Sequence, residues 1–412
     1  MDLDVVFLGT AGSMPTAQRS PAALMIRRGG DRLLFDCAEG TQRQLLRSSV
    51  GLVDLREVFL THFHADHVLG LPGMLKTFAL RGREQPLEVY GPRGLVELIG
   101  SLRRVVGKLT YDVRLVELSP GDVLERDGYR LATFAVAHGV SAIGWSMIEA
   151  TRPGRFDVEA ADALGIPSGP ERGLLQRGER ISVSDGRTIE PEQVLGPPRP
   201  GRKIVLTGDT APSEHVVEAA WGADVFVTEA TFSDEERERA EETKHQTATQ
   251  AADAARRANV RLLALTHLSS RYFGPEIARE ARALFSETVV PRDLDVVVAP
   301  YAERGEPHLV KGGATRGRDR RASVAGGKAV TLPQRAEGRI IDAVAAMVRV
   351  AVAGDVSEAE EIQGILRSAG IDSHLADGED DSVIVSVPES SVEQAQDAIE
   401  AMTEPDDLVG EP

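Results

Sequence analysis

The sequence predicts a layered α/β protein, because short apolar strands alternate with amphipathic helical patterns throughout its first 310 residues. Several strand candidates are apolar at every position, which is typical of strands that are buried on both faces. The strand candidates are residues 5–8, 33–35, 58–60, 87–90, 131–135, 203–207, 225–228, 262–266 and 295–299. The helical patterns between them cover residues 41–49, 94–106, 215–220, 247–258 and 275–285.

One stretch interrupts this alternation of strands and helices. Residues 153–202 contain seven prolines and eight glycines and show little of the periodic apolar pattern that a packed core requires. Long irregular excursions of this kind usually lie on the surface and are often functional. We therefore expect an arm of about residues 153–202 that projects from a first domain formed by residues 1–310.

The composition changes after residue 310. Residues 311–339 are rich in glycine, alanine and arginine and lack apolar periodicity, which predicts a flexible basic linker. Residues 340–412 then show strand patterns at 348–353, 371–375 and 382–387 and helical patterns at 357–368 and 392–402. This order predicts a small ferredoxin-like α+β module. It contains one histidine, His374, and no cluster of catalytic residue types, so we expect it to regulate or to bind a partner that the sequence does not identify.

The formal charge argues at first against a nucleic-acid partner. The chain has 47 Lys+Arg against 64 Asp+Glu, a net charge of −17, whereas phosphate recognition usually needs basic surface. The charge is unevenly distributed: residues 340–412 hold 2 Lys+Arg and 18 Asp+Glu (net −16), the linker is +6, and residues 1–310 are −7. Most of the acidity therefore belongs to the tail module, and nucleic-acid binding by the first domain would depend on local basic patches.

Cysteine content and hydropathy indicate the compartment. A single cysteine, Cys37, excludes an intrachain disulfide and a thiolate zinc cluster, and fits a reducing environment. The first four residues include two acids, and no apolar run approaches the ~18–20 residues that cross a bilayer. We expect a soluble cytoplasmic protein without membrane segments.

The strongest chemical signal is the segment 61–67, which directly follows the strand candidate 58–60. It places four residues of metal-ligand type, His62, His64, Asp66 and His67, in one short turn. Two of the histidines can bind one metal ion, and the Asp–His pair can bind a neighbouring one. Imidazole and carboxylate donors suit Zn²⁺ or Mn²⁺.

Three more ligand candidates follow other strands. His138, Asp209 and His267 each lie just beyond the carboxyl end of a strand candidate, where α/β folds gather their functional sites. Asp36 follows the strand candidate 33–35 in the same way. It can accept a hydrogen bond from a metal-binding imidazole, or it can serve as a turn or helix-capping residue.

These residues, in this order, resemble the metallo-β-lactamase superfamily, and within it the chain resembles the ribonuclease Z family over about residues 3–310. The resemblance is carried by FLGTAGSMPT (7–16), LLFDCAEGTQRQLL (33–46), FLTHFHADHVLGLPG (59–73), HGVSAIGW (138–145), LGPPRPGRKIVLTGDT (195–210), EATF (229–232) and LTHLSSRY (265–272). It implies an αββα sandwich with a protruding exosite arm, and an enzyme that removes the 3′ trailer from precursor tRNA.

The resemblance also implies roles for the site residues. His62, His64 and His138 would hold one Zn²⁺, and Asp66, His67 and His267 the other, with Asp209 bridging the two ions. Asp66 would accept a proton from the attacking water, His245 would act as general acid, and Glu229 would orient His245. The products would be a tRNA 3′-hydroxyl and a trailer 5′-phosphate, and the family implies a homodimer.

The arm lacks the lysine-rich patch usual in bacterial members of the family. Its remaining candidates for phosphate contacts are Arg172, Arg177, Arg180 and Arg187. The loop 15–20 reads PTAQRS, without the Lys and Asn of the Pro-x-Lys-x-Arg-Asn pattern that is associated with rejecting mature CCA ends. The position of the cut relative to CCA therefore stays open.

Three further alternatives also stay open. The same metal site could act on small molecules, as a phosphodiesterase or an arylsulfatase, although the arm would be useless for such a substrate. A protein with a decayed site could serve only to bind RNA. The tail module could sense a ligand or bind a protein, or its acidic body could occupy the RNA path and inhibit the enzyme.

Overall fold

The computed structural model describes residues 2–52, 55–183 and 186–312, and in the tail residues 347–353, 359, 362–364, 366–367, 370–377, 383–388, 391 and 394–395. The chain divides into two compact units, Met1–Arg321 and Ala322–Pro412. Nearly all of the predicted linker, 311–339, lies outside the described residues.

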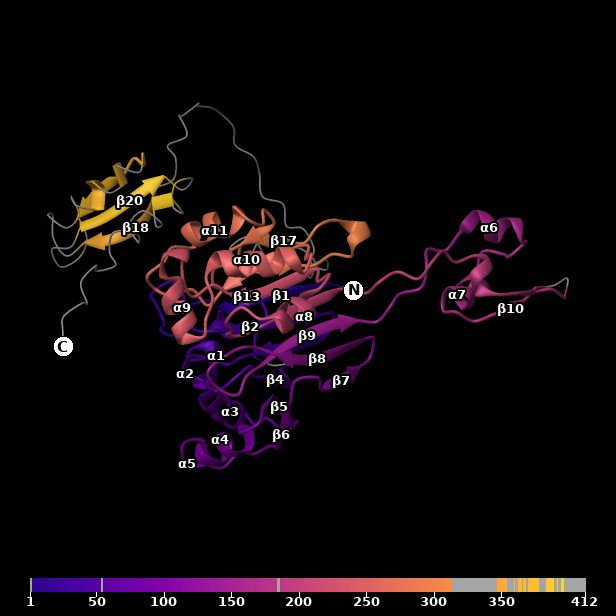
Figure 1. The fold of residues 1–412 in the computed structure, drawn as a ribbon, viewed down its shortest axis with the longest axis horizontal. Coiled ribbons are helices and arrows are strands. Elements are labelled where there is room, and N and C mark those ends of the chain that lie inside the picture. The colour runs from indigo at the N-terminus through magenta and orange to yellow at the C-terminus, as the bar shows by residue number, and fades with distance from the viewer. Residues whose placement is uncertain are drawn as a thin grey trace, which may run out of the picture. The chain divides into compact units, whose positions relative to one another are not determined.

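The first unit contains an eight-stranded sheet with the order β17-β16-β1-β2-β3-β4-β5-β6 (Figure 1). Strands β3 to β6 pair in parallel, whereas β1 pairs antiparallel with both β2 and β16. The strands are β1 (Leu3–Gly9), β2 (Ala23–Arg28), β3 (Asp31–Phe35), β4 (Glu57–Phe59), β5 (Leu87–Pro92), β6 (Val113–Leu118), β16 (Val296–Val298) and β17 (His308–Val310).

A second, seven-stranded sheet has the order β15-β14-β13-β12-β9-β8-β7. Strands β12, β13 and β14 are parallel, and β12 pairs antiparallel with β9. The strands are β7 (Val123–Arg126), β8 (Tyr129–Ala135), β9 (Ile143–Glu149), β12 (Lys203–Leu206), β13 (Val225–Glu229), β14 (Leu263–Thr266) and β15 (Thr288–Val289).

The two sheets face each other across a core that includes Phe35, Phe59, Tyr90 and Trp145. Helices α1, α3, α4 and α5 bury apolar side chains against the outer face of the first sheet, and α8, α10 and α11 cover the second sheet. These four layers confirm the predicted αββα sandwich. The helices are α1 (Thr41–Arg47), α2 (Ala65–Val68), α3 (Gly70–Leu80), α4 (Leu95–Ser101), α5 (Arg103–Val106), α8 (Glu214–Ala220), α9 (Arg237–Thr243), α10 (Ala248–Arg257) and α11 (Gly274–Arg282), with short 3₁₀ turns η2 (Asp234–Glu236) and η3 (Ala302–Arg304).

The helical pattern predicted over residues 94–106 is present, but it does not form one continuous helix. Two helices, α4 and α5, are separated at Leu102. Gly100, a poor helix former, lies two residues before this break and lowers the helical preference of the segment.

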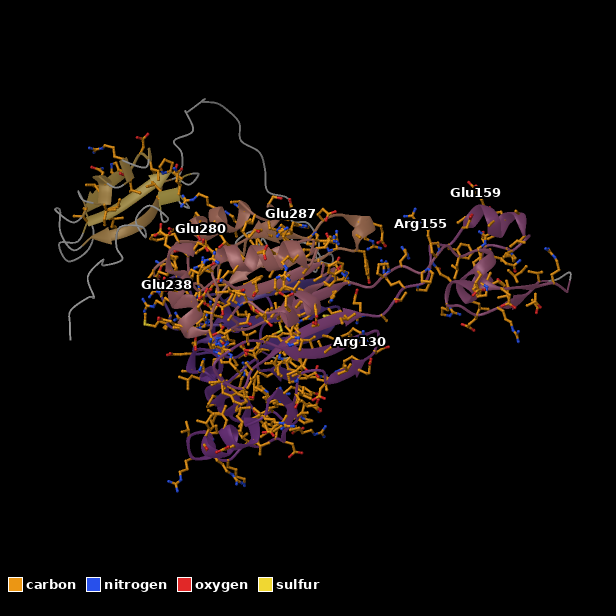
Figure 2. All side chains as sticks on the ribbon, in the orientation of Figure 1. Arg130, Arg155, Glu159, Glu238, Glu280 and Glu287 are labelled. Atoms are coloured by element: carbon orange, nitrogen blue, oxygen red, sulfur yellow. The ribbon has the colours of Figure 1, made fainter. Side chains whose placement is uncertain are left out.

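The arm leaves the sandwich at the end of β9 and returns at the start of β12 (Figure 1). Figure 2 shows Arg155 on the connection and Glu159 on the outer part of the arm. The outer part contains α6 (Val158–Ala163), α7 (Pro170–Gln176), β10 (Ile181–Ser182), β11 (Thr188–Ile189) and the 3₁₀ turn η1 (Pro191–Gln193).

The expectation that the arm has little core was wrong. A separate apolar cluster is buried within it, formed by Ala161, Ile166, Leu175, Ile181, Ile189 and Val194. These six residues are spaced irregularly along the chain, so neither a helical nor a strand period reveals them. The arm is therefore a small folded head, residues 156–195, carried on two extended strands.

The second unit contains a three-stranded antiparallel sheet with the order β18-β20-β19, formed by β18 (Met347–Ala353), β19 (His374–Asp377) and β20 (Val383–Pro388). The second strand begins later than the predicted 371–375, because the buried Ile371 still belongs to the turn, where its N–H bonds the carbonyl of Leu366. Helical residues of this unit contribute Ala359, Ile362, Leu366 and Ala395 to its core. Parts of both predicted helices, 357–368 and 392–402, lie outside the described residues.

No helix among the described residues combines the length and the hydropathy that crossing a membrane would need.

Candidate metal centre

The candidate ligands converge because they follow the carboxyl ends of strands in both sheets. Asp36 and His62 follow the parallel strands β3 and β4, and His138 follows β8. Asp209 and His267 follow β12 and β14, and Glu229 is the last residue of the intervening strand β13. Strand ends that face each other across the sandwich thus bring residues about 200 positions apart, such as His67 and His267, into one site.

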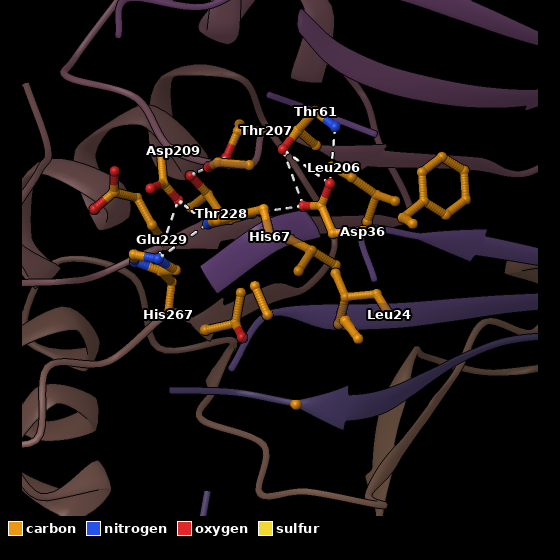
Figure 3. A pocket seen from close by; sticks show the side chains of 17 residues that line it. Leu24, Asp36, Thr61, His67, Leu206, Thr207, Asp209, Thr228, Glu229 and His267 are labelled. Carbon is orange, nitrogen blue, oxygen red and sulfur yellow. Dashed lines mark hydrogen bonds and ion pairs between the residues drawn. The ribbon is translucent and has the colours of Figure 1, made fainter. Parts of the chain in front are cut away.

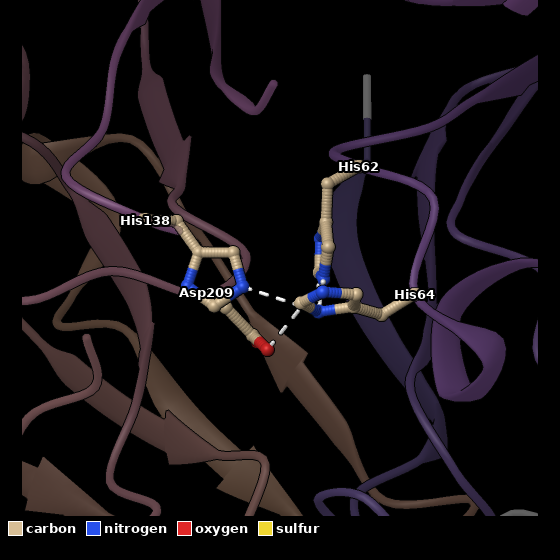
Figure 4. Close-up of side chains that lie close together, drawn as sticks. All are labelled: His62, His64, His138 and Asp209. Carbon is tan, nitrogen blue, oxygen red and sulfur yellow. Dashed lines mark hydrogen bonds and ion pairs between the residues drawn. The ribbon is translucent and has the colours of Figure 1, made fainter. Parts of the chain in front are cut away.

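One group of possible ligands consists of His62, His64, His138 and Asp209, whose donor atoms all lie within 4.8 Å of one another (Figure 4). His64 Nδ1 lies 3.0 Å from His62 Nε2 and 3.2 Å from His138 Nε2. Asp209 Oδ2 lies 3.7 Å from His62 Nε2. Four donors that point at one small space form the kind of site that holds a metal ion.

A second group lies on the other side of Asp209 and consists of Asp66, His67 and His267. The Nε2 atoms of His67 and His267 are 3.2 Å apart, and His267 Nε2 lies 3.2 Å from Asp66 Oδ2. Asp209 Oδ1 lies 3.4 Å from both Nε2 atoms. One aspartate therefore faces both groups, one oxygen toward each.

The bonding of Asp209 indicates that these residues fit metal ions. Its Oδ1 atom is buried and has no hydrogen-bond partner, a costly state for a carboxylate oxygen unless a cation occupies the space beside it. Burial alone would raise the pKa of Asp209, but His267 and His67 lower it well below its ordinary value. Burial and the neighbouring His67 lower the pKa of His62 to about 2, so this imidazole is neutral and able to bind a metal.

Asp36 orients one of these imidazoles. Its Oδ2 accepts a hydrogen bond of 2.8 Å from His67 Nδ1, and its Oδ1 accepts one from the backbone N–H of Thr61. Helix α1 begins after Gly40, so Asp36 does not cap it. The hydrogen bond to Nδ1 leaves Nε2 of His67 directed at Asp209 and His267.

His245 and Glu229 lie beside the second group. His245 Nδ1 is 2.8 Å from Glu229 Oε1, and the His245 ring stacks 5.7 Å from the His267 ring. Glu229 is buried and also accepts hydrogen bonds from the N–H of Thr210 and the hydroxyl of Thr231. Although burial lowers the pKa of His245, the Glu229 carboxylate outweighs that effect and raises it to about 9. His245 therefore carries a proton at neutral pH.

Sequence reasoning missed several residues that hold this arrangement together. The backbone N–H of Ser13 donates to Asp66 Oδ2 over 2.8 Å, and Thr231 Oγ1 lies 2.9 Å from His267 Nδ1. Gly12 must be glycine, because a Cβ there would lie 2.7 Å from His267 Nδ1. Thr231 adjoins Glu229 in the segment EATF, so its position was a usable signal, whereas a backbone N–H leaves no trace in residue type.

A cavity of about 30 Å³ lies directly beneath the centre (Figure 3). Its wall includes Asp36, Thr61, His67, Thr228 and Glu229. A cavity of this size accommodates roughly one or two water molecules.

The four arginines expected to contact RNA have different environments in the arm. Arg172 is turned inward: it forms an ion pair with Asp162, donates to the carbonyl of Ile166, and has a side chain only 15% exposed. Arg177 is exposed and pairs with Glu179. Arg180 and Arg187 are exposed as well, and Arg187 donates to the carbonyl of Leu164.

The sandwich and its site of histidines and aspartates at strand ends define a protein of the metallo-β-lactamase superfamily. The family model described as the metallo-beta-lactamase superfamily matches residues 17–146. The full first unit has closer relatives. The chain is 44% identical over 303 residues to a protein named ribonuclease Z from Methanosarcina acetivorans, covering 73% of this chain and 99% of that protein.

A second relative named ribonuclease Z, from Natronomonas pharaonis, is 46% identical over 308 residues, covering 74% of this chain and 100% of that protein. The crystal structure of human tRNase Z, short form, has a TM-score of 0.53 and 26% identity, covering 72% of this chain and 99% of that chain. The chain belongs to the ribonuclease Z family. About a quarter of it lies outside these matches.

Proposed function

We propose that this protein is a metal-dependent endoribonuclease that removes the 3′ trailer from precursor tRNA, leaving a tRNA 3′-hydroxyl and a trailer 5′-phosphate. The observation that carries the proposal is the convergence of seven ligand-type residues with the His245–Glu229 pair in one site. Membership in the ribonuclease Z family and the similarity to human tRNase Z support the tRNA substrate.

The seven ligand-type residues divide naturally between two ions, for which we propose Zn²⁺, with Mn²⁺ as the substitute that the same donors accept. His62, His64 and His138 would hold one ion, Asp66, His67 and His267 the other, and Asp209 would bridge them. When bound, the two ions supply positive charge to the scissile phosphate and make a water molecule acidic enough to attack it.

Two side chains handle the protons of the hydrolysis. Asp66 is the proton acceptor: although burial raises its pKa, His267 and His67 lower it below the ordinary value, so the carboxylate is charged. As the water oxygen bonds to phosphorus, its proton passes to Asp66, and the bond from phosphorus to the tRNA 3′ oxygen breaks. His245 gives its proton to that departing oxygen. Because Nδ1 of His245 is bonded to Glu229, Nε2 is the atom that donates.

The folded head of the arm would bind the tRNA body away from the metal centre. The exposed Arg177, Arg180 and Arg187 are the proposed phosphate contacts, whereas Arg172 serves the packing of the head itself. A homodimer and a cytoplasmic location complete the proposal and rest on the family and on the sequence.

The decisive test is incubation with 3′-extended precursor tRNA, with and without an encoded CCA, followed by mapping of both new ends. We expect one cut at the base of the trailer, with a 3′-hydroxyl and a 5′-phosphate, and a cut about 10²- to 10⁴-fold slower with His245→Ala. Precursor tRNA left intact by the metal-loaded protein would contradict the proposal. Removal of the arm head, residues 156–195, distinguishes a small-molecule phosphodiesterase, because it should abolish tRNA cleavage and spare bis(p-nitrophenyl) phosphate.

A further inference from the structure

The two extended strands that carry the arm head form a stem, defined here as residues 150–155 and 196–202. Arg152 and Arg199 exchange two backbone hydrogen bonds, of 2.8 and 2.9 Å, and the N–H of Gly196 bonds the carbonyl of Arg155. Gly154 allows this close approach, because a Cβ there would lie 1.8 Å from the carbonyl oxygen of Gly196. The stem thus consists of two chain segments that pair at isolated points between the head and strands β9 and β12.

A single carboxylate from outside the arm ties both strands of the stem to the sandwich. Glu303, in the turn η3, accepts hydrogen bonds from Arg152 Nη1 over 2.7 Å and from Arg199 Nη1 over 2.9 Å. Arg152 Nη2 also donates to the second oxygen of Glu303 over 3.2 Å. The two arginines are the same residues that pair across the stem, so Glu303 holds the stem at one defined point.

An aromatic ring from the same loop reinforces this link. The guanidinium carbon of Arg152 lies 3.5 Å, and that of Arg202 4.0 Å, from the centre of the Tyr301 ring, close enough for strong cation–π contact. Arg202 continues into the body: it pairs with the buried Glu149 over 2.8 Å and donates to the carbonyl of Ala299. Two sets of contacts therefore hold the stem to the body: those of Arg202, next to β12, and the ion pair of Arg152 with Glu303.

The contacts that hold the stem to the body lie away from the metal centre. Strand β12 begins one residue after Arg202 and ends three residues before Asp209. The stem and the metal centre thus lie at opposite ends of the same strand, which a paired sheet keeps roughly 20 Å apart. None of Arg152, Arg199, Tyr301 or Glu303 belongs to the centre or to the core of the head.

We propose that Glu303 and Tyr301 are positioning residues that fix the direction in which the arm leaves the body, so that head and metal centre can hold one folded RNA together. This rests on the proposed function. A long substrate gains affinity from two separated sites only if their spacing matches its own. A small phosphodiester occupies the centre alone and is indifferent to the direction of the arm.

The first test compares Glu303→Gln with the matched control Glu306→Gln. Glu306 lies in the same loop but pairs with Arg261, away from the arm, so both variants lose one surface carboxylate. We expect Glu303→Gln to raise KM for precursor tRNA about three- to tenfold, the range for a lost surface ion-pair network, with kcat nearly unchanged. Cleavage of bis(p-nitrophenyl) phosphate by both variants should match that of the unaltered protein.

The second test separates the role of the aromatic ring of Tyr301 from that of its hydroxyl group. Tyr301→Phe keeps the stacking surface and should behave like the unaltered protein, whereas Tyr301→Leu should raise KM for precursor tRNA. Because the one native cysteine is buried, spin labels at Glu192→Cys on the head and Glu218→Cys on the body can report their separation. Glu303→Gln and Tyr301→Leu should broaden that distance distribution.

The outcomes distinguish this inference from the proposed function. If the unaltered protein fails to cut precursor tRNA, the proposed function is wrong. If it cuts, but Glu303→Gln leaves both KM and the distance distribution unchanged, the contact of Glu303 with the stem has no positioning role. A lower KM in that variant would also overturn the inference, because it would mean that the contact holds the arm away from the RNA.

Discussion

The metal centre and the arm lie at the two ends of strand β12 and differ in how they use charge. At the carboxyl end of β12, Asp209 is buried beside His67 and His267, and each of the three is held in place by several partners. At the other end the stem leads to a head with exposed arginines. In the centre, almost every polar side chain pairs or hydrogen-bonds within the site. In the arm, by contrast, one arginine packs within the head while others are exposed to solvent. Residue type therefore indicates role in the centre but not in the arm.

The largest expected effect tests whether Asp209, which faces both groups of ligands, bridges two metal ions. Asp209→Ala should lower kcat about 10³-fold or more, since the charge stabilisation that bound metal supplies is worth several kcal/mol. Metal content measured by mass spectrometry should fall as well. Asp253→Asn, on the outer face of α10, is the control and should retain both. Full activity of Asp209→Ala would show that Asp209 does not bridge the two metal ions.

His245 tests whether the centre separates binding of metal from transfer of protons. His245→Ala should lower kcat about 10²- to 10⁴-fold, the usual contribution of a general acid, while metal content stays the same. Glu229→Gln should give a smaller loss, because the amide no longer holds the imidazolium in its charged form. Loss of metal in His245→Ala would instead identify His245 as a ligand, since it also lies near Asp209 and His267.

Asp36 tests the layer of hydrogen bonds behind the ligands. Asp36→Asn should weaken metal affinity or activity about 10- to 100-fold, because an amide cannot accept the His67 Nδ1 proton with the strength of a carboxylate. Titration with a metal chelator measures the affinity directly. Asp31→Asn, exposed at the start of β3, is the matched control. Equal chelator sensitivity of both variants would show that Asp36 does not orient His67.

The sandwich and the position of the centre could be predicted because both leave local marks in the sequence. Strands such as β12 and β14 carry short buried apolar runs, and Asp209 and His267 follow these strands within three residues. Local sequence patterns do not reveal contacts that are made by backbone atoms or by residues far apart in the chain. The Ser13 N–H that bonds Asp66 is independent of side-chain type, and Tyr301 meets Arg152 from about 150 positions away.

The arm shows the same limit more sharply. Arg172 and Arg180 lie eight residues apart in a stretch that contains both acidic and basic residues. Residue type alone makes both of them candidates for phosphate contacts. Only the fold of the head turns Arg172 onto Asp162 and the carbonyl of Ile166. The apolar residues that force this fold, such as Leu175 and Ile189, come together through a compact chain path that has no sequence period.

The smallest expected effect follows from this difference between two arginines of the head. Arg180→Ala should raise KM for precursor tRNA only a few-fold, and it should reduce the slope of log KM against log salt by roughly one phosphate contact. Arg172→Ala should leave that slope unchanged, because its guanidinium is bonded within the head, and should instead make the head sensitive to limited proteolysis. If both variants reduced the salt slope equally, Arg172 would have to leave Asp162 when RNA binds, and the head would rearrange on its substrate.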